Sequence, residues 1–188
     1  IIGIFQDSML GCYRFSRENI NFNQKDAMNL LMMFNKVDTE KLQKPTISNF
    51  DILTQITPPL SLKVKNKQFN SDKEKADTSN NVVEIRDGTY IRGQMDKGIL
   101  GSGTKGLLHR VTNDFGNMAA ADYIDDLQNV VTEYMKSSGF SVGISDLISD
   151  AKTNSEIVKV ITNKKTDVKN LIDQTQIGVF ENNSGKTN

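Results

Sequence analysis

The sequence predicts an α+β fold in which short strands and a β-hairpin pack with a few amphipathic helices, the last of them long. Three patterns carry this prediction. Residues 82–93, VVEIRDGTYIRG, place two apolar runs on either side of an Asp-Gly pair, which is typical of a two-residue hairpin turn. Residues 117–136 repeat apolar side chains at helical spacing, and so do residues 153–177. The sequence shows no internal repeat.

The N-terminal apolar runs IIGIF and LGCYRF, residues 1–5 and 10–15, are predicted to be two strands. The polar QDSM would connect them. This connection contains Gln6 and Asp7, an amide and an acid that can hold neighbouring backbone or reach a ligand. Cys12, on the second predicted strand, is expected to be a small core residue.

The next region is predicted to begin with a helix and then become irregular. Asn23 is placed to cap a helix whose apolar residues follow at intervals of three, four and seven, namely Ala27, Leu30, Leu31 and Phe34. From residue 37 to 62 the pattern is irregular, and Pro45 with the Pro58–Pro59 pair argues against a regular helix. Residues 65–81 are almost entirely polar, so we expect a mobile surface insert.

The second half is predicted to contain the hairpin, a glycine-rich stretch and two helices. Pairing across the hairpin turn puts Val83, Ile85 and Tyr90 on one face. The helix over 117–136 carries one apolar stripe, and Gly139 is placed to end it; the stripe comprises Ala120, Ile124, Leu127, Val131 and Tyr134. A capping box formed by Thr153 and Glu156 is expected to start the last helix, which runs to about residue 177. Its stripe comprises Ile157, Val160, Ile161, Val168, Leu171 and Ile172.

Composition excludes several classes of protein. The formal net charge is zero, so no global basic field favours nucleic-acid binding. One cysteine and one histidine can form neither a disulfide framework nor a thiolate–imidazole zinc site, and a single cysteine indicates a reducing, intracellular location. No apolar run approaches the roughly 18 residues that span a bilayer. Because the chain begins without methionine on an apolar run, we expect it to be a piece of a longer polypeptide.

Local patterns offer no self-contained catalytic set. Gly98 and Gly103 have the spacing of a phosphate-binding loop, but Thr104-Lys105 reverses the required order, so a flexible turn is the favoured interpretation. His109 has no nucleophile at a fixed spacing and is expected to pack against neighbouring leucines. Asp125 and Asp126 are consecutive, so on a helix they point about 100° apart and cannot chelate one metal ion together. No metal site is predicted.

Three stretches, in order, resemble the largest subunit of multisubunit DNA-directed RNA polymerases. QDSMLG resembles the Q-D-x-x-x-G segment that follows the catalytic aspartate loop. GSGTKGLLHRVTNDFG resembles the glycine-rich G-L-I-H stretch of the family. SSGFSVGISDLISD resembles the signature N-G-F-S-x-G-I-x-D-x-I-x-D. Within these stretches the residues singled out as a structural signature are Gly11, Gly101, Gly106, His109, Gly139, Phe140, Ser141, Gly143, Asp146 and Asp150.

The resemblance implies a pore domain over residues 1–145 and the start of a funnel domain over residues 146–188. In the family these regions line the secondary channel, through which nucleoside triphosphates enter and backtracked RNA is extruded. Gln6 and Asp7 would lie near the active centre, and the glycine-rich signature would brace the funnel helices. The implied partners are the second-largest and other polymerase subunits, template DNA, RNA and nucleoside triphosphates, with a transcript-cleavage factor in the channel and no membrane.

The chain also departs from the family pattern. The N-A-D-F-D-G-D motif, whose aspartates hold the catalytic Mg²⁺, does not occur in it. We therefore expect that motif upstream and the trigger loop and bridge helix downstream, with no catalytic residue and no bound Mg²⁺ here. Where the family has W-x-G-K-Q, only Gln55 is kept. The implied location is the nucleus, or the cytoplasm or virion if the source is a large DNA virus.

Two other interpretations stay open at the level of sequence. The chain could be a stand-alone protein-interaction module without catalytic activity, with the polar insert 65–81 and open strand edges as its docking surface. It could also be a small phosphate-binding enzyme built on the glycine-rich loop around Lys105. The first predicts a partner lost on deletion of 65–81, and the second predicts nucleotide binding lost in Lys105→Ala.

Overall fold

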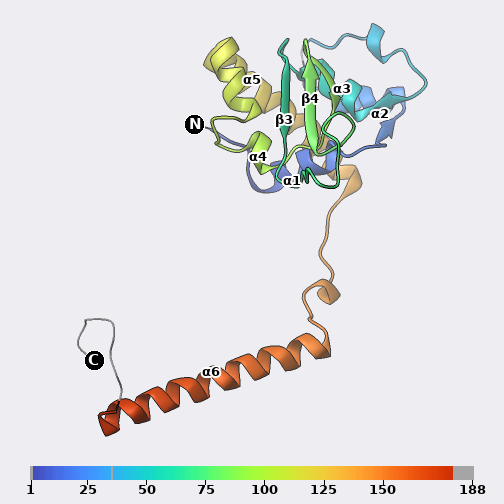
Figure 1. Ribbon diagram of the computed structural model, residues 1–188. Coiled ribbons are helices and arrows are strands. Elements are labelled where there is room, and N and C mark those ends of the chain that lie inside the picture. The colour runs from blue at the N-terminus through green and yellow to red at the C-terminus, as the bar shows by residue number, and fades with distance from the viewer. Residues whose placement is uncertain (1, 35, 180–188) are drawn as a thin grey trace. The chain divides into compact units, whose positions relative to one another are not determined.

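The computed structural model describes residues 2–34 and 36–179, which divide into two compact units after Gly139 (Figure 1). The first unit has helices and two small antiparallel sheets. Its helices are α1 (Gln6–Phe15), α2 (Gln24–Leu30), the 3₁₀ helix η1 (Glu40–Leu42), α3 (Asn49–Ile56), α4 (Lys97–Leu100) and α5 (Leu107–Ser138). Its strands are β1 (Asn21–Phe22), β2 (Ile47–Ser48), β3 (Leu62–Lys65), β4 (Val82–Arg86) and β5 (Thr89–Arg92). The predicted α+β class is confirmed.

The first element is a helix and not the predicted pair of strands. Helix α1 covers both the supposed connection at residues 6–9 and the second supposed strand. Residues 2–5 form no strand, and residue 1 lies outside the described residues. Gly11, Cys12 and Phe15 are buried on one face of α1. Helical geometry gathers these side chains against α5, so tertiary packing outweighs their strand propensity. Cys12 is a core residue as predicted.

Helix α2 begins as predicted but ends early. The side chain of Asn23 accepts a hydrogen bond from the backbone N–H of Asp26 at 2.8 Å. The helix stops at Leu30, and Phe34 packs against the core from beyond it. Asn35, next along the chain, lies outside the described residues.

Helix α3 occupies a region that the sequence analysis expected to be irregular. Ser48 and Asp51 form a full capping box, in which each residue's side chain accepts from the other's backbone N–H at 3.0 Å. Ile52, Leu53 and Ile56 are buried along one side. The prolines stand before and after this helix, so they bound it without interrupting it.

The predicted hairpin is confirmed and belongs to a three-stranded sheet. Asp87 and Gly88 have φ of 46° and 78°, as a two-residue hairpin turn of this kind requires. Ile85 pairs with Tyr90, and both are buried together with Val83. Strand β3, which the sequence analysis missed, pairs antiparallel with β4 from Leu62 opposite Ile85 to Lys65 opposite Val82.

The polar segment that connects β3 to β4 is tied to the sheet by hydrogen bonds. The backbone N–H of Asn66 donates to the carbonyl of Asn81 at 2.9 Å, and the Asn81 amide donates to the Glu74 carboxylate at 3.0 Å. The Asn80 side chain accepts from the N–H of Gly93 at 3.1 Å. These hydrogen bonds hold both ends of the segment to the sheet, and its mobility stays a prediction.

Helix α5 bends at Gly116, whose φ of 88° and ψ of 172° are not helical. Its second part therefore starts at Asn117, as the sequence predicted, and a shorter helical part precedes the bend. Ala120, Leu127 and Val131 of the predicted stripe are buried, while Ile124 and Tyr134 are partly buried. Gly139 ends the helix with φ of 58°.

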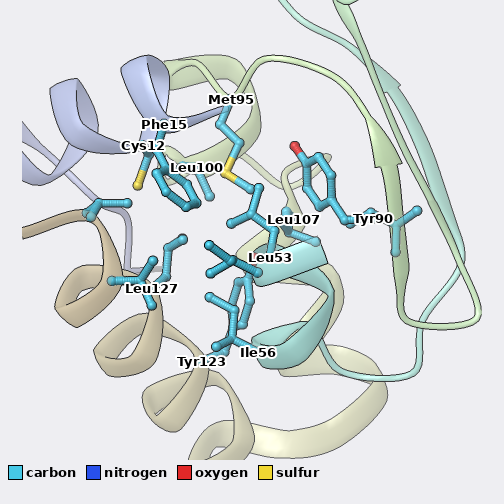
Figure 2. Packing of buried hydrophobic residues seen from close by; sticks show 14 of the residues in the cluster. Cys12, Phe15, Leu53, Ile56, Tyr90, Met95, Leu100, Leu107, Tyr123 and Leu127 are labelled. Atoms are coloured by element: carbon cyan, nitrogen blue, oxygen red, sulfur yellow. The ribbon is translucent and has the colours of Figure 1, made fainter. Parts of the chain in front are cut away.

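The core of the first unit lies where α1, α3 and α5 meet the three-stranded sheet. Figure 2 shows Cys12 and Phe15 of α1, Leu53 and Ile56 of α3, Leu127 of α5 and Tyr90 of β5 around this core. The segment between β5 and α5 contributes Met95 and Leu100, which are also fully buried. This core fixes α1 and the 95–107 segment against the same helix.

The second unit contains the 3₁₀ helix η2 (Ile144–Asp146) and the long helix α6 (Ala151–Ile177). The predicted Thr153–Glu156 capping box is wrong, because Asp150 caps the helix by accepting from the backbone N–H of Thr153 at 2.7 Å. The helix ends where predicted. Its apolar stripe is exposed within this unit, with Leu171 at 46% and Val160 at 60% of full exposure. The units divide earlier than the predicted boundary at 145; their assignment to pore and funnel stays a prediction.

Candidate functional site

Gln6 and Asp7 lie on the surface at the first turn of α1, and not in a connection between strands. Gln6 has φ of 50°, a left-handed conformation that is uncommon for a residue with a side chain. Phe5 occupies the N-cap position, and its side chain makes no capping hydrogen bond. The Asp7 carboxylate therefore stands at the positive end of the helix dipole, which favours a negative charge.

The segment before α1 lies beside the glycine-rich stretch. The backbone N–H of Ile4 donates to the carbonyl of Leu100 at 2.9 Å. A Cβ on Gly3 would lie 2.8 Å from the backbone nitrogen of Ser102, closer than real Cβ contacts. Residue 3 must therefore lack a side chain for the two backbones to pass this closely. This contact brings Gln6 and Asp7 near the 101–106 loop, two segments that the sequence analysis had connected only through the resemblance.

Gly101 and Gly106 are required by close backbone approach inside the loop. A Cβ on Gly101 would lie 2.3 Å from the carbonyl oxygen of Lys97, and one on Gly106 would lie 2.7 Å from that of Ile99. Asp96 starts the stretch by capping α4, since its carboxylate accepts from the N–H of Gly98 at 2.8 Å. The stretch thus forms a turn whose backbone passes close to other backbone, and its predicted flexibility stays a prediction.

The phosphate-loop interpretation of the same stretch is wrong. Such a loop follows a strand and leads into a helix that starts at its lysine. Here helix α4 precedes the loop, and α5 begins at Leu107, beyond Lys105. The loop backbone closes on itself, with the N–H of Gly106 bonded to the carbonyl of Gly103 at 3.2 Å.

His109 lies on the first turns of α5 beside a groove of about 520 Å³. We expected His109 to pack against neighbouring leucines; Leu108 lines the same groove, and the His109 ring is half-buried. The ring Nε2 lies 3.0 Å from the side-chain amide of Asn113. The remaining lining is Ile2, Thr112, Asn117, Ala120, Ala121 and Ile124.

The signature stretch 139–150 is organised by its two aspartates. Asp146 accepts from the N–H of Gly143 at 2.8 Å, and Asp150 caps α6. The hydrogen bonds that Thr153 donates to the Asp150 carboxylate hold its pKa below the usual value. Gly143 has an ordinary φ of −74°, so its conformation does not require glycine, whereas that of Gly139 does.

Phe140 and Ser141 follow Gly139 and are exposed. Together with Val142, Ile144, Leu147 and Ile148 they leave an apolar surface on the second unit by itself. Four of the six side chains are aliphatic and one is aromatic, a composition that is typical of a contact with protein and not with solvent.

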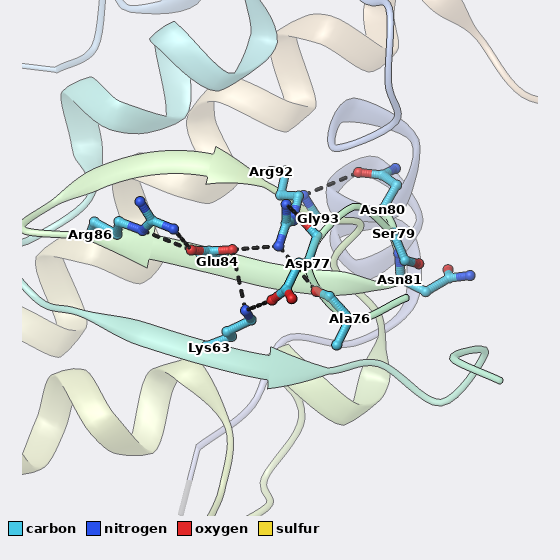
Figure 3. Close-up of polar contacts among 10 residues, drawn as sticks. All are labelled: Lys63, Ala76, Asp77, Ser79, Asn80, Asn81, Glu84, Arg86, Arg92 and Gly93. Carbon is cyan, nitrogen blue, oxygen red and sulfur yellow. Dashed lines mark hydrogen bonds and ion pairs between the residues drawn. The ribbon is translucent and has the colours of Figure 1, made fainter. Parts of the chain in front are cut away.

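The sequence analysis missed an ionic cluster on β4, which Figure 3 shows. The Glu84 carboxylate is buried and faces Arg86, Arg92 at 2.5 Å and Lys63 at 3.9 Å. The hydrogen bond from Arg86 is the main cause that lowers the pKa of Glu84. Lys63 also pairs with Asp77 at 2.6 Å, and Arg92 donates to the carbonyls of Ala76 and Asp77. The cluster therefore fastens the 66–81 segment to the sheet. In the sequence, only the alternation of apolar and charged residues along β4 indicated this cluster.

Comparison with known proteins identifies the family of this chain. A family model described as "RNA polymerase Rpb1, domain 3" matches residues 1–147. The chain belongs to this family of the largest RNA polymerase subunit. Two subunits of Trypanosoma brucei brucei, DNA-directed RNA polymerase II subunits RPB1-B and RPB1-A, are each 27% identical to it over 174 residues. Each alignment covers 90% of this chain and 10% of the relative, so the chain spans about a tenth of the length of these curated relatives.

The Rpb1 match contains every predicted site residue except Asp150. Gly11, Gly101 and Gly106 each stand where a side chain would collide, and Gly139 has a positive φ. The structure thus gives a physical reason for glycine at these four signature positions of the Rpb1 segment.

The described part of this Rpb1-family chain offers no group of three His, Cys, Asp or Glu side chains that could hold a metal ion. Asp125 and Asp126 do not change this. The pKa of Asp126 is raised, mainly by partial burial and to a smaller extent by the nearby Asp122 and Asp125 carboxylates. Over residues 2–34 and 36–179, the helices are also too short or too polar to cross a membrane.

Proposed function

We propose that this chain lines the secondary channel of a DNA-directed RNA polymerase, through which nucleotides enter and backtracked RNA is extruded. The proposal rests on one observation above all. The Gln6–Asp7 pair of the family's Q-D-x-x-x-G motif is exposed at the uncapped start of α1. A polar pair that the fold keeps on the surface is available to a ligand.

The geometry supports a role in contact and positioning. The Gln6 amide carries two N–H donors and one acceptor oxygen, which suit the edges and sugar hydroxyls of nucleotides. The Asp7 carboxylate accepts hydrogen bonds and repels phosphate, so it would favour passage over tight retention of a polyanion. The Gly3–Ser102 and Ile4–Leu100 contacts hold this pair against the glycine-rich loop.

The catalytic metal would be held elsewhere in the subunit. In the family, Mg²⁺ is bound by the aspartates of a motif that this chain lacks, and its described residues provide no alternative ligand set. When bound, the ion activates the RNA 3′-hydroxyl and stabilises the leaving pyrophosphate. The residues of this chain would shape the route to that centre, and the 139–150 signature would support the start of the funnel helices.

The remaining expectations follow from the same proposal. The parent enzyme would be a nucleotidyltransferase that acts with the second-largest and other subunits on template DNA, RNA and nucleoside triphosphates. A transcript-cleavage factor would share the channel. The two relatives are named as subunits of RNA polymerase II, which supports a nuclear location.

Photo-crosslinking in the assembled polymerase tests the proposal. A benzophenone amino acid would replace Gln6, and a complex stalled with a backtracked, labelled RNA would be irradiated. We expect crosslinks to the extruded 3′ segment of the RNA. The control places the same group at Met32, which is 76% exposed in the same unit. Equal crosslinking at residues 6 and 32, or none at residue 6, would contradict the proposal.

The stand-alone interaction module is less well supported. Its docking surface was to be the 65–81 insert and open strand edges. The Glu84 cluster and the Asn66–Asn81 contact hold the insert against the sheet. Replacement of residues 66–81 by a two-residue Asn-Gly turn would distinguish the two. The module predicts loss of a partner, whereas the channel proposal predicts an assembled polymerase that still crosslinks at residue 6.

A further inference from the structure

We infer that Arg14 is a positioning residue that joins the Gln6–Asp7 helix to Gly139, the residue from which the signature stretch departs. The inference deepens the proposed function and rests on it, because it assigns how the helix of the exposed pair is held to the end of α5. Neither the sequence patterns nor the family resemblance singled out Arg14.

The contact is made at the C-terminal end of α5. Arg14 lies in the last turn of α1, and its Nη1 donates to the carbonyl oxygen of Gly139. The last carbonyls of a helix lack partners within the helix and carry the negative end of its dipole. A guanidinium at this position satisfies one of these carbonyls and places a positive charge where the dipole favours it.

The carbonyl that Arg14 holds belongs to a residue with special geometry. Gly139 has φ of 58°, and its N–H closes the last turn by donating to Met135 at 2.9 Å. Its carbonyl belongs to the peptide group that follows the last turn of α5. Arg14 therefore acts on the peptide group at which this helix ends.

The rest of α1 makes the connection stiff. Gly11 packs so closely on α5 that a Cβ there would lie 3.0 Å from the Cβ of Val131. The end of α1 is also held by side chains of other segments: Gln94 donates to the carbonyl of Tyr13 at 3.0 Å, and Asn49 donates to the carbonyls of Phe15 and Arg17. Gln6 and Arg14 lie about 12 Å apart along the axis of α1, at about 1.5 Å of rise per residue. A shift at one end is thus transmitted to the other.

The matched control is Arg17. It follows Arg14 on the same end of α1 and is exposed, and its guanidinium lies 5.7 Å over the ring of Tyr13. Arg17→Ala removes the same charge from the same region without removing the Gly139 contact. Arg14→Lys keeps the charge and one donor but loses the planar fork, so it tests rescue by a conservative change.

The test uses the assembled polymerase and two readouts. Hydrogen exchange of the backbone amides of residues 136–141 reports the last turn of α5. Loss of one hydrogen bond corresponds to about fivefold faster exchange, which we expect in Arg14→Ala. Arg14→Lys should fall between this variant and the wild type, and Arg17→Ala should match the wild type. The second readout is the rate of cleavage of backtracked RNA divided by the rate of forward elongation. We expect this ratio to fall about threefold or more in Arg14→Ala and to recover in Arg14→Lys.

The outcomes separate the inference from the proposed function. Unchanged exchange in Arg14→Ala, or an equal change in Arg17→Ala, would overturn the inference whatever residue 6 crosslinks to. Faster exchange with an unchanged rate ratio would reduce Arg14 to a structural contact and overturn its positioning role. Failure of the residue 6 crosslink would instead reject the channel proposal. If Arg14→Ala does not assemble, Arg14→Lys alone still discriminates, because only a contact with Gly139 predicts faster exchange at residues 136–141 than in Arg17→Ala.

Discussion

Gly11 of α1 lies directly against Val131 of α5, so that a Cβ on residue 11 would approach the Val131 Cβ to 3.0 Å and its Cγ2 to 3.1 Å. Val131 is fully buried. This relationship sets the distance between the helix that carries Gln6 and Asp7 and the helix that leads to Gly139.

Gly11→Val should therefore destabilise the protein. Overpacking at this contact forces the two helices apart or strains side chains, at a cost of about 1–3 kcal/mol. Urea unfolding of the chain, followed by circular dichroism, measures this cost. The control is Gly103→Val, since a Cβ on Gly103 meets nothing within 4 Å. Equal unfolding midpoints for the two variants would show that α1 and α5 are not packed this closely.

Gly139→Ala should cost more than Gly143→Ala. Gly139 has φ of 58° and ψ of 169°, a conformation that is essentially restricted to glycine and costs a residue with a Cβ about 1–3 kcal/mol. Gly143 has φ of −74°, and a Cβ there would stay 3.3 Å from its nearest neighbours, so we expect a change within about 0.5 kcal/mol. Unfolding midpoints of the two single variants give the comparison. A larger effect at residue 143 would reverse our assignment of the helix end.

Glu84 should make stability sensitive to acid. Its pKa and that of Asp77 are lowered in the folded protein, chiefly by hydrogen bonds from Arg86 and from Lys63 respectively. The unfolded chain thus binds these protons more readily. The contribution of the pair is fully present above the ordinary pKa values of 4.5 and 3.8 and is lost as pH falls through the lower folded values.

The measurement is the urea midpoint between pH 7 and pH 3. We expect Glu84→Gln to lower the midpoint at pH 7 and to flatten its decline toward pH 3. Asp72→Asn, at an exposed position of the 66–81 segment, should leave both features unchanged. A wild-type slope in Glu84→Gln would mean that the acid sensitivity arises from other carboxylates.

Cys12 should be unreactive in the folded protein. Burial raises the pKa of its thiol to about 12, so almost no thiolate forms near pH 8, and the side chain is closed off from solvent. Because this is the only cysteine, labelling with a disulfide reagent reports one site. We expect labelling to occur only as the protein unfolds, with a rate that rises in Gly11→Val. Rapid stoichiometric labelling of the native chain would contradict the packing of α1.

Sequence patterns predicted the elements whose signals are local. The Asp87-Gly88 turn, the start of the helix at Asn117 and its end at Gly139 all depend on backbone preferences that a few adjacent residues determine. The capping box at Ser48 and Asp51 was equally local, with Ile52, Leu53 and Ile56 behind it. It was missed because the prolines were expected to disrupt this region, whereas they lie only before and after the helix.

Other features depend on contacts between distant segments. Residues 10–15 have strand-like composition, and only packing of Gly11, Cys12 and Phe15 against α5 makes them helical. The Glu84 cluster joins β3, β4, β5 and the segment between them, and Arg14 reaches Gly139 across 125 positions in sequence. No periodicity within one segment indicates such pairs. The family resemblance identified the signature residues but not what holds them.

An electron cryomicroscopy structure of the parent polymerase with a backtracked RNA would test the central claim most directly. We predict that the extruded RNA passes the N-terminal turn of α1, with Gln6 or Asp7 within hydrogen-bonding distance of the RNA or of an incoming nucleotide. A structure that places this turn away from the channel, or buries it against another subunit, would contradict the proposed function.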